Sequence, residues 1–108
     1  VTTPAEHDRM MSLVQGLTHL ETILMGLTLR NTGVEASALD PFSTPVFRTK
    51  QAIIEKVFGP RPGLYAALLA ENPNMPGLLE IFEKNFLMVK EMILRGDTTG
   101  LEALLKKS

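Results

Sequence analysis

The N-terminal part of the chain alternates apolar and polar positions with the period of an α-helix. Apolar side chains recur there at spacings of three and four residues, which is typical of the buried stripe of one helix packed along another. These positions are Met10, Leu13, Leu17, Leu20, Leu24 and Leu27. The pattern predicts a long helix from about Pro4 to Leu29. Gly16 and Gly26 lie inside it, and we expect them to permit close helix contact, since glycine otherwise weakens a helix interior.

The middle of the chain predicts a long connection and a second helix. Residues 30–44 are rich in Asn, Gly, Ser, Asp and Pro and have no periodicity, so we expect an irregular loop. The second helix should begin at Ser43 or Thr44, with Pro45 in its first turn. It should end at Phe58, because Gly59 can supply a left-handed cap and Pro60 blocks continuation.

The same reasoning predicts a third helix, a long fourth helix and a short C-terminal one. The third runs from Pro62 to Glu71 and stops at an Asn-Pro pair. The fourth runs from Met75 to Arg95 and stops at a glycine. Threonine with glutamate three residues later forms a capping box both at Thr3, before the first helix, and at Thr99, before the last.

Composition favours one folded, all-α domain over residues 1–108, with about five helices of which two are long. Hydrophobic residues make up 44% of the chain and charged residues 21%, as in globular domains. No stretch alternates with period two, so no strand is expected. The first and fourth helices are apolar on more than one face, which a five-helix monomer covers poorly. We therefore expect self-association.

Charge and cysteine content exclude several classes of function. The net charge of −1 gives no overall attraction to nucleic acid or to an anionic membrane. Without cysteine there can be no disulfide, thiolate metal site or cysteine nucleophile, which fits a cytoplasmic setting. No apolar run is long enough to span a membrane. The chain begins at Val1, which favours a domain taken from a longer protein.

A seam of polar side chains interrupts the apolar surface of the first predicted helix. His7, Met11, Gln15 and His19 are spaced by four residues, and we expect them on one side together with Thr18 and Thr22. Burying such groups without partners would cost about 1–3 kcal/mol each, so something polar should face them. The two histidines are about 18 Å apart along a helix and cannot share a metal ion, so no metal site is predicted.

The second predicted helix carries a local excess of positive charge. Arg48, Ala52 and Lys56 recur every four residues, so two cations flank a small residue on one face. Together with Arg61 nearby, they would suit an anion of the size of a carboxylate. A solvated basic face with no ligand is the competing interpretation. No nucleophile elbow, glycine-rich phosphate loop or dinucleotide fingerprint occurs, so no catalytic residue is predicted in this domain.

Four segments, in order, resemble the C-terminal helical domain of prephenate dehydrogenases. They are Glu-His-Asp at residues 6–8, Val-Gln-Gly-Leu-Thr-His at 14–19, Ser-Thr-Pro-Val-Phe-Arg at 43–48 and Gly-Leu-Tyr-Ala-Ala at 63–67. Each segment is weak alone, but their order and spacing together are specific. The resemblance covers nearly the whole chain and implies a fold like the C-terminal helical domain of 6-phosphogluconate dehydrogenase, forming an intertwined dimer.

The resemblance also implies a function. In that family an NAD- or NADP-dependent enzyme oxidatively decarboxylates prephenate to 4-hydroxyphenylpyruvate in tyrosine biosynthesis. The cofactor site and the catalytic histidine belong to an N-terminal Rossmann domain that these residues do not include. By position, His19 and Gln15 would line the substrate cleft, with His7 near the domain junction and with Arg48 and Lys56 facing the cleft.

One position departs from the family. Lys56 stands where an arginine usually binds the ring carboxylate of prephenate, and lysine keeps the charge without the bidentate fork. Either Lys56 substitutes as a point charge, or Arg48 or Arg61 takes over, and arogenate stays open as the preferred substrate. Two rival readings of the chain are a non-enzymatic helical dimerisation module and a small regulatory domain that binds an aromatic amino acid.

Overall fold

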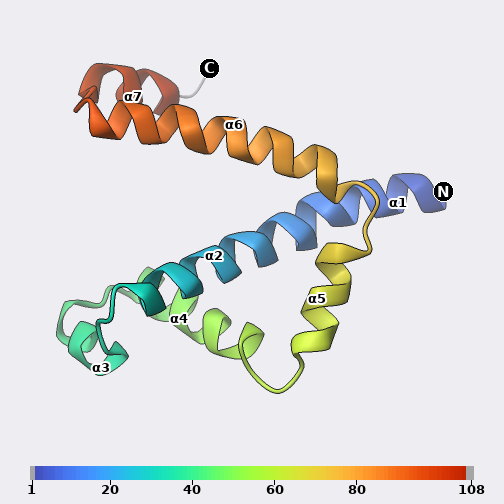
Figure 1. Ribbon diagram of the computed structural model, residues 1–108, viewed down its shortest axis with the longest axis horizontal. Helices are drawn as coiled ribbons and strands as arrows, with labels where there is room; N and C mark the ends of the chain where they lie inside the picture. Colours follow the sequence, from blue (N-terminus) through green and yellow to red (C-terminus); the bar gives the residue numbers. More distant parts are fainter. Residues whose placement is uncertain (1, 107–108) are drawn as a thin grey trace. The chain divides into compact units, whose positions relative to one another are not determined.

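The structure, a computed structural model, describes residues 2–106, and all regular elements within that range are helices (Figure 1). The all-α prediction is confirmed, with two long helical segments as expected. Residues 2–106 form seven α-helices in place of about five, because the first predicted helix is interrupted and the predicted loop contains a short helix. The chain divides into two compact units, Val1–Met75 and Pro76–Ser108.

The first predicted helix is present, but a wider turn divides it. Helix α1 spans Pro4–Met11, the π-helical turn η1 spans Ser12–Gly16, and α2 spans Leu17–Asn31. The predicted cap at Thr3 is confirmed, since its hydroxyl accepts a hydrogen bond from the backbone N–H of Glu6 at 3.1 Å. A π turn holds one more residue than an α turn, and spacing patterns in the sequence do not reveal it.

The connection after α2 is more ordered than predicted. It holds the single-turn helix α3, Ala36–Leu39, and the 3-10 turn η2, Asp40–Phe42. The prediction of an irregular loop was therefore wrong for these residues. One turn of helix is too short to show periodicity in the sequence.

Helix α4, Pro45–Val57, begins as predicted and packs against α2. The hydroxyl of Thr44 accepts from the N–H of Phe47 at 3.2 Å and caps the helix. Gly26 lies under the ring of Phe58, where an added Cβ would stand 2.5 Å from the ring Cε1, so the predicted close contact is confirmed. The left-handed cap predicted at Gly59 was wrong, because only Gly33 and Gly96 have positive φ within residues 2–106.

Helix α5, Pro62–Ala70, packs against η1 and α2 and closes the first unit. Met75, which is 4% exposed, lies over Gly16, where an added Cβ would be 2.6 Å from its sulfur. Val57, at 6%, is the other buried apolar side chain found in the described part of the chain. The apolar core of this unit is therefore small.

The second unit is a pair of helices, α6, Met75–Leu94, and α7, Thr98–Leu105. The predicted stop at Gly96 is confirmed, since α6 ends at Leu94 and Gly96 has a positive φ of 64°. The predicted cap at Thr99 was wrong. The carboxylate of Asp97 accepts from the N–H of Gly100 at 2.8 Å, so α7 begins at Thr98, two residues earlier than a cap at Thr99 would place its start.

Apolar side chains stay exposed over much of the surface of α6. Ile81 is 61% exposed and Leu94 is 76% exposed. The other large exposed apolar residues of this helix are Leu79, Phe86, Leu87, Met88 and Ile93. Soluble proteins rarely leave large apolar surfaces open to water, so these side chains of α6 need a covering surface.

Candidate functional site

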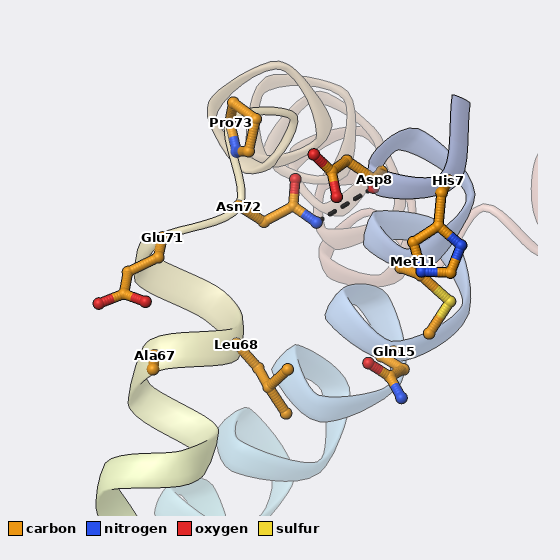
Figure 2. Close-up of a pocket in the computed structure, with 9 residues that line it drawn as sticks. All are labelled: His7, Asp8, Met11, Gln15, Ala67, Leu68, Glu71, Asn72 and Pro73. Atoms are coloured by element: carbon orange, nitrogen blue, oxygen red, sulfur yellow. Dashed lines mark hydrogen bonds between the residues drawn. The ribbon is translucent and has the colours of Figure 1, made fainter. Parts of the chain in front are cut away.

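The polar seam of the first helix lies beside α5, with His7 exposed and Met11, Gln15 and His19 half-buried. His7, Met11 and Gln15 line a hollow of about 290 Å³ together with the last turn of α5 (Figure 2). The opposite wall consists of Ala67, Leu68, Glu71, Asn72 and Pro73. The structure therefore brings two of the predicted site residues, His7 and Gln15, into one cavity.

Asn72 joins the two walls of this hollow. Its side-chain amide donates a hydrogen bond to the backbone carbonyl of Asp8 at 3.1 Å, the dashed line in Figure 2. Its carbonyl oxygen accepts from the backbone N–H of Asn74 at 2.9 Å. The lining includes two carboxylates, Asp8 and Glu71, and neither lysine nor arginine. This hollow on its own is thus poorly suited to a dianion.

His19 lies farther along the seam, against Tyr65 of α5. The two rings meet edge to face, with centroids 5.0 Å apart and planes at 77°. The Nδ1 atom of His19 is buried and has no hydrogen-bond partner within the described part of the protein. An unpaired buried ring nitrogen is costly, and because it is shielded from solvent it can reach a ligand only if a neighbouring group moves.

Thr18 and Thr22 do not share the side of the histidines, contrary to the prediction. They line a separate small hollow with residues of α4. The hydroxyl of Thr18 donates to the carbonyl of Val14 at 2.7 Å, and that of Thr22 donates to the carbonyl of Thr18 at 2.9 Å. Both hydroxyls are satisfied by their own helix.

A second, basic hollow lies at the other end of α5. Lys56, Arg61 and Tyr65 line a cavity of about 360 Å³, together with Pro60 and Leu64. Arg48 is not among its lining residues, and it precedes Lys56 on the same helix by about 12 Å. Of the cations considered from the sequence, the structure therefore brings Lys56 and Arg61 together and leaves Arg48 apart. Tyr65 connects this hollow to His19.

Sequence reasoning missed the roles of Tyr65 and Asn72. In the sequence Tyr65 stands out only as part of the Gly-Leu-Tyr-Ala-Ala segment, but its ring reaches both His19 and the basic hollow. Asn72 was seen only as the residue before a helix-stopping proline. The only hint in the sequence is that each of these two residues carries a polar atom and has apolar neighbours along the chain. That arrangement is too common in proteins to identify a binding site.

No group of three or more histidine, aspartate or glutamate side chains lies close enough to hold a metal ion among residues 2–106. None of the helices in that range is both long and apolar enough to cross a membrane.

The fold and its uncovered apolar surface are those of a helical association domain. Comparison with known proteins then gives the family. The family described as "Prephenate dehydrogenase, dimerization domain" matches residues 3–107, and the chain belongs to it.

Individual relatives agree with this assignment. The chain is 32% identical over 108 residues to a "Probable arogenate/prephenate dehydrogenase" of Methanocaldococcus jannaschii, covering 100% of the chain and 24% of that relative. It is 28% identical over 92 residues to a "T-protein" of Enterobacter agglomerans, covering 85% and 25%. It is 27% identical over 98 residues to a "4-amino-4-deoxyprephenate dehydrogenase" of Streptomyces pristinaespiralis, covering 91% and 33%.

The chain thus spans about a quarter to a third of the length of these curated relatives. No solved structure matches the chain.

Proposed function

We propose that this chain is the dimerisation and substrate-binding domain of a dehydrogenase that acts on prephenate or arogenate. The family match over residues 3–107 carries the proposal. It is supported by relatives whose names specify dehydrogenases of prephenate, arogenate or an amino-substituted prephenate. The reaction is the oxidative decarboxylation of prephenate to 4-hydroxyphenylpyruvate, a step of tyrosine biosynthesis.

The domain contributes dimerisation through its apolar helices. Seven large apolar side chains of α6 are exposed. A second copy of the chain would remove this surface from water, with a gain of about 25 cal/mol per Å² of apolar area buried. The homodimer is therefore part of the proposal.

The basic hollow binds a carboxylate of the substrate. The ammonium of Lys56 and the guanidinium of Arg61 provide two positive charges beside Tyr65. A guanidinium can hold a carboxylate by two parallel hydrogen bonds, whereas an ammonium acts as a point charge. Arg61 can thus supply the fork that Lys56 lacks, while Tyr65 places an aromatic face beside the substrate ring.

The seam provides polar groups on the other side of Tyr65. His19 packs edge to face against Tyr65 and holds that ring beside the basic hollow, and Gln15 and His7 line the hollow at the other end of α5. These groups orient a bound molecule. Orientation of reactants is worth several kcal/mol in enzyme catalysis.

The nicotinamide cofactor belongs to a separate Rossmann domain of the full-length enzyme. The chain contains no glycine-rich strand-turn-helix fingerprint, and its described elements are helices alone, so these residues do not fit a dinucleotide site. That other domain would hold NAD or NADP, which would supply the hydride acceptor. The present domain binds and orients the substrate.

The test is steady-state kinetics of the full-length gene product with prephenate and arogenate. Lys56→Ala removes one charge-assisted interaction, worth about 1.5–3 kcal/mol, so the prephenate KM should rise about 10- to 100-fold. The cofactor KM should stay within about twofold, because the cofactor binds elsewhere. Lys50→Ala, on the same helix but paired with Glu21 at 2.8 Å, is the matched control and should leave both KM values unchanged.

Two results would overturn parts of the proposal. Equal increases in the prephenate and cofactor KM values would refute the assignment of Lys56 to the substrate. A full-length product without NAD- or NADP-dependent activity on prephenate or arogenate would favour the rival interpretation, a helical dimerisation module without enzymatic function.

A further inference from the structure

The alignment of the polar seam is not what an uninterrupted α-helix would produce. In an α-helix each residue turns by about 100°, so side chains four residues apart drift by about 40° per step. Over the three steps from His7 to His19 the drift would reach about 120°. Residues at the two ends of such a seam could not face the same neighbouring helix.

In the structure both ends of the seam adjoin α5. His7, Met11 and Gln15 share a hollow with the last turn of α5, and His19 meets Tyr65 of the same helix. The π turn at Ser12–Gly16 lies between His7 and His19. Because it takes up one extra residue, it cancels about 100° of rotation and leaves the two histidines only about 20° apart.

Three contacts hold the π turn. Ser12 is 2% exposed, and its hydroxyl donates to the carbonyl of Arg9 at 2.6 Å. Thr18 makes the corresponding bond to Val14 on the other side of the turn. Such hydroxyl bonds to a preceding carbonyl loosen and bend helices. Gly16, at the end of the turn, is buried beneath Met75, which fixes the widened turn in place.

We propose that the π turn sets the register of the polar seam and that Ser12 is a positioning residue that maintains it. Through this turn His7, Met11 and Gln15 stand on the α5 side together with His19. The contribution of this register to substrate binding rests on the proposed function. The register itself is a property of the chain and is tested separately.

One insertion and one deletion test the register in the full-length protein. Val14 is 64% exposed, so removing it costs little packing and leaves an uninterrupted helix in which His7 and His19 stay about 20° apart. Inserting one alanine after Val14 rotates α1 by about 100° relative to α2. The deletion should retain the prephenate KM within about threefold, and the insertion should raise it at least tenfold, with the cofactor KM unchanged in both.

Substitutions of Ser12 give a second measurement that keeps the fold intact. Ser12→Ala removes the bond to Arg9 and should raise the prephenate KM about fivefold, whereas Ser12→Thr keeps a hydroxyl and should restore it. If the substitutions disturbed only the packing of the helix, both variants would lower the thermal stability, and their prephenate KM values would not differ. If Ser12→Ala and Ser12→Thr behave alike, Ser12 is not the positioning residue.

A cross-link reads the register without any substrate. Cysteines at Met11 and Leu68, which line one hollow, should be joined by a short bismaleimide and be found as a linked peptide by mass spectrometry. The link should persist on deletion of Val14 and be lost on the alanine insertion. If the link responds as expected but the full-length protein has no activity on prephenate or arogenate, the proposed function fails and the register stands. If deletion and insertion abolish the link equally in folded proteins, the register proposal is overturned.

Discussion

Gly26 is the position where a single methyl group should most clearly disturb the first unit. In Gly26→Ala the new Cβ would stand 2.5 Å from Cε1 and 2.8 Å from Cζ of Phe58, and 3.1 Å from Cγ2 of Ile54. Contacts this short force the ring or the helix to move. The ring also lies under the guanidinium of Arg30, 5.2 Å from its centroid, so moving it disturbs that contact too.

The expected magnitude follows from two opposing terms. Alanine in a helix interior is favoured over glycine by about 1 kcal/mol, and overpacking of a close contact costs about 1–3 kcal/mol. Gly26→Ala should therefore lower the free energy of unfolding by up to about 2 kcal/mol. Gly63→Ala in α5 is the control, because a Cβ there has no neighbour within 4 Å. It should raise stability by up to about 1 kcal/mol.

Urea unfolding followed by far-UV circular dichroism measures both variants. The two proteins must be compared at one protein concentration, because association adds to the apparent stability. The expected separation is about 1–3 kcal/mol, or several degrees in Tm for a domain of this size. If Gly26→Ala stabilises the protein as much as Gly63→Ala does, the close packing of α2 against Phe58 is refuted.

Two further predictions concern the second unit. Asp97→Ala should destabilise α7 by about 0.5–2 kcal/mol, because the helix loses its cap, and amide hydrogen exchange in α7 should become faster. Thr99→Ala should have little effect. If Thr99→Ala had the larger effect, Thr99 would be the cap, as the sequence predicted. Ile81→Asp places a charge on the exposed apolar surface of α6 and should shift the protein from dimer to monomer in analytical ultracentrifugation. Asn85→Asp adds the same charge at a polar exposed position of α6 and should leave the dimer intact. If both variants dissociate the dimer equally, net charge and not this surface controls association.

Most helix boundaries could be predicted because they depend on local chemistry. Proline in the first turn, a hydroxyl cap and a glycine stop act over three or four residues, so Thr44 and Gly96 were identified correctly. Asp97 was missed because two capping candidates, an aspartate and a threonine, lie within one turn. Their competition is decided by the backbone path out of the preceding helix and not by residue type.

The candidate site could be predicted only in part. Residue types and spacing identified His7, Gln15, His19 and Lys56 as unusual, but not which of them share a cavity. The structure separates an acidic hollow at one end of α5 from a basic one at the other. Which helix faces which depends on packing between segments far apart in the chain, and no local pattern encodes it.

The seam shows where the division lies. The sequence by itself determined that four side chains capable of polar or soft contacts recur every four residues along an apolar helix. Whether these side chains lie along the same neighbouring helix was decided by the π turn and by the packing of Met75 against Gly16. In an ideal helix they would have spread over about a third of the circumference. A helix's twist is local, but the departure from ideal twist is stabilised by tertiary contacts, which only the folded structure contains.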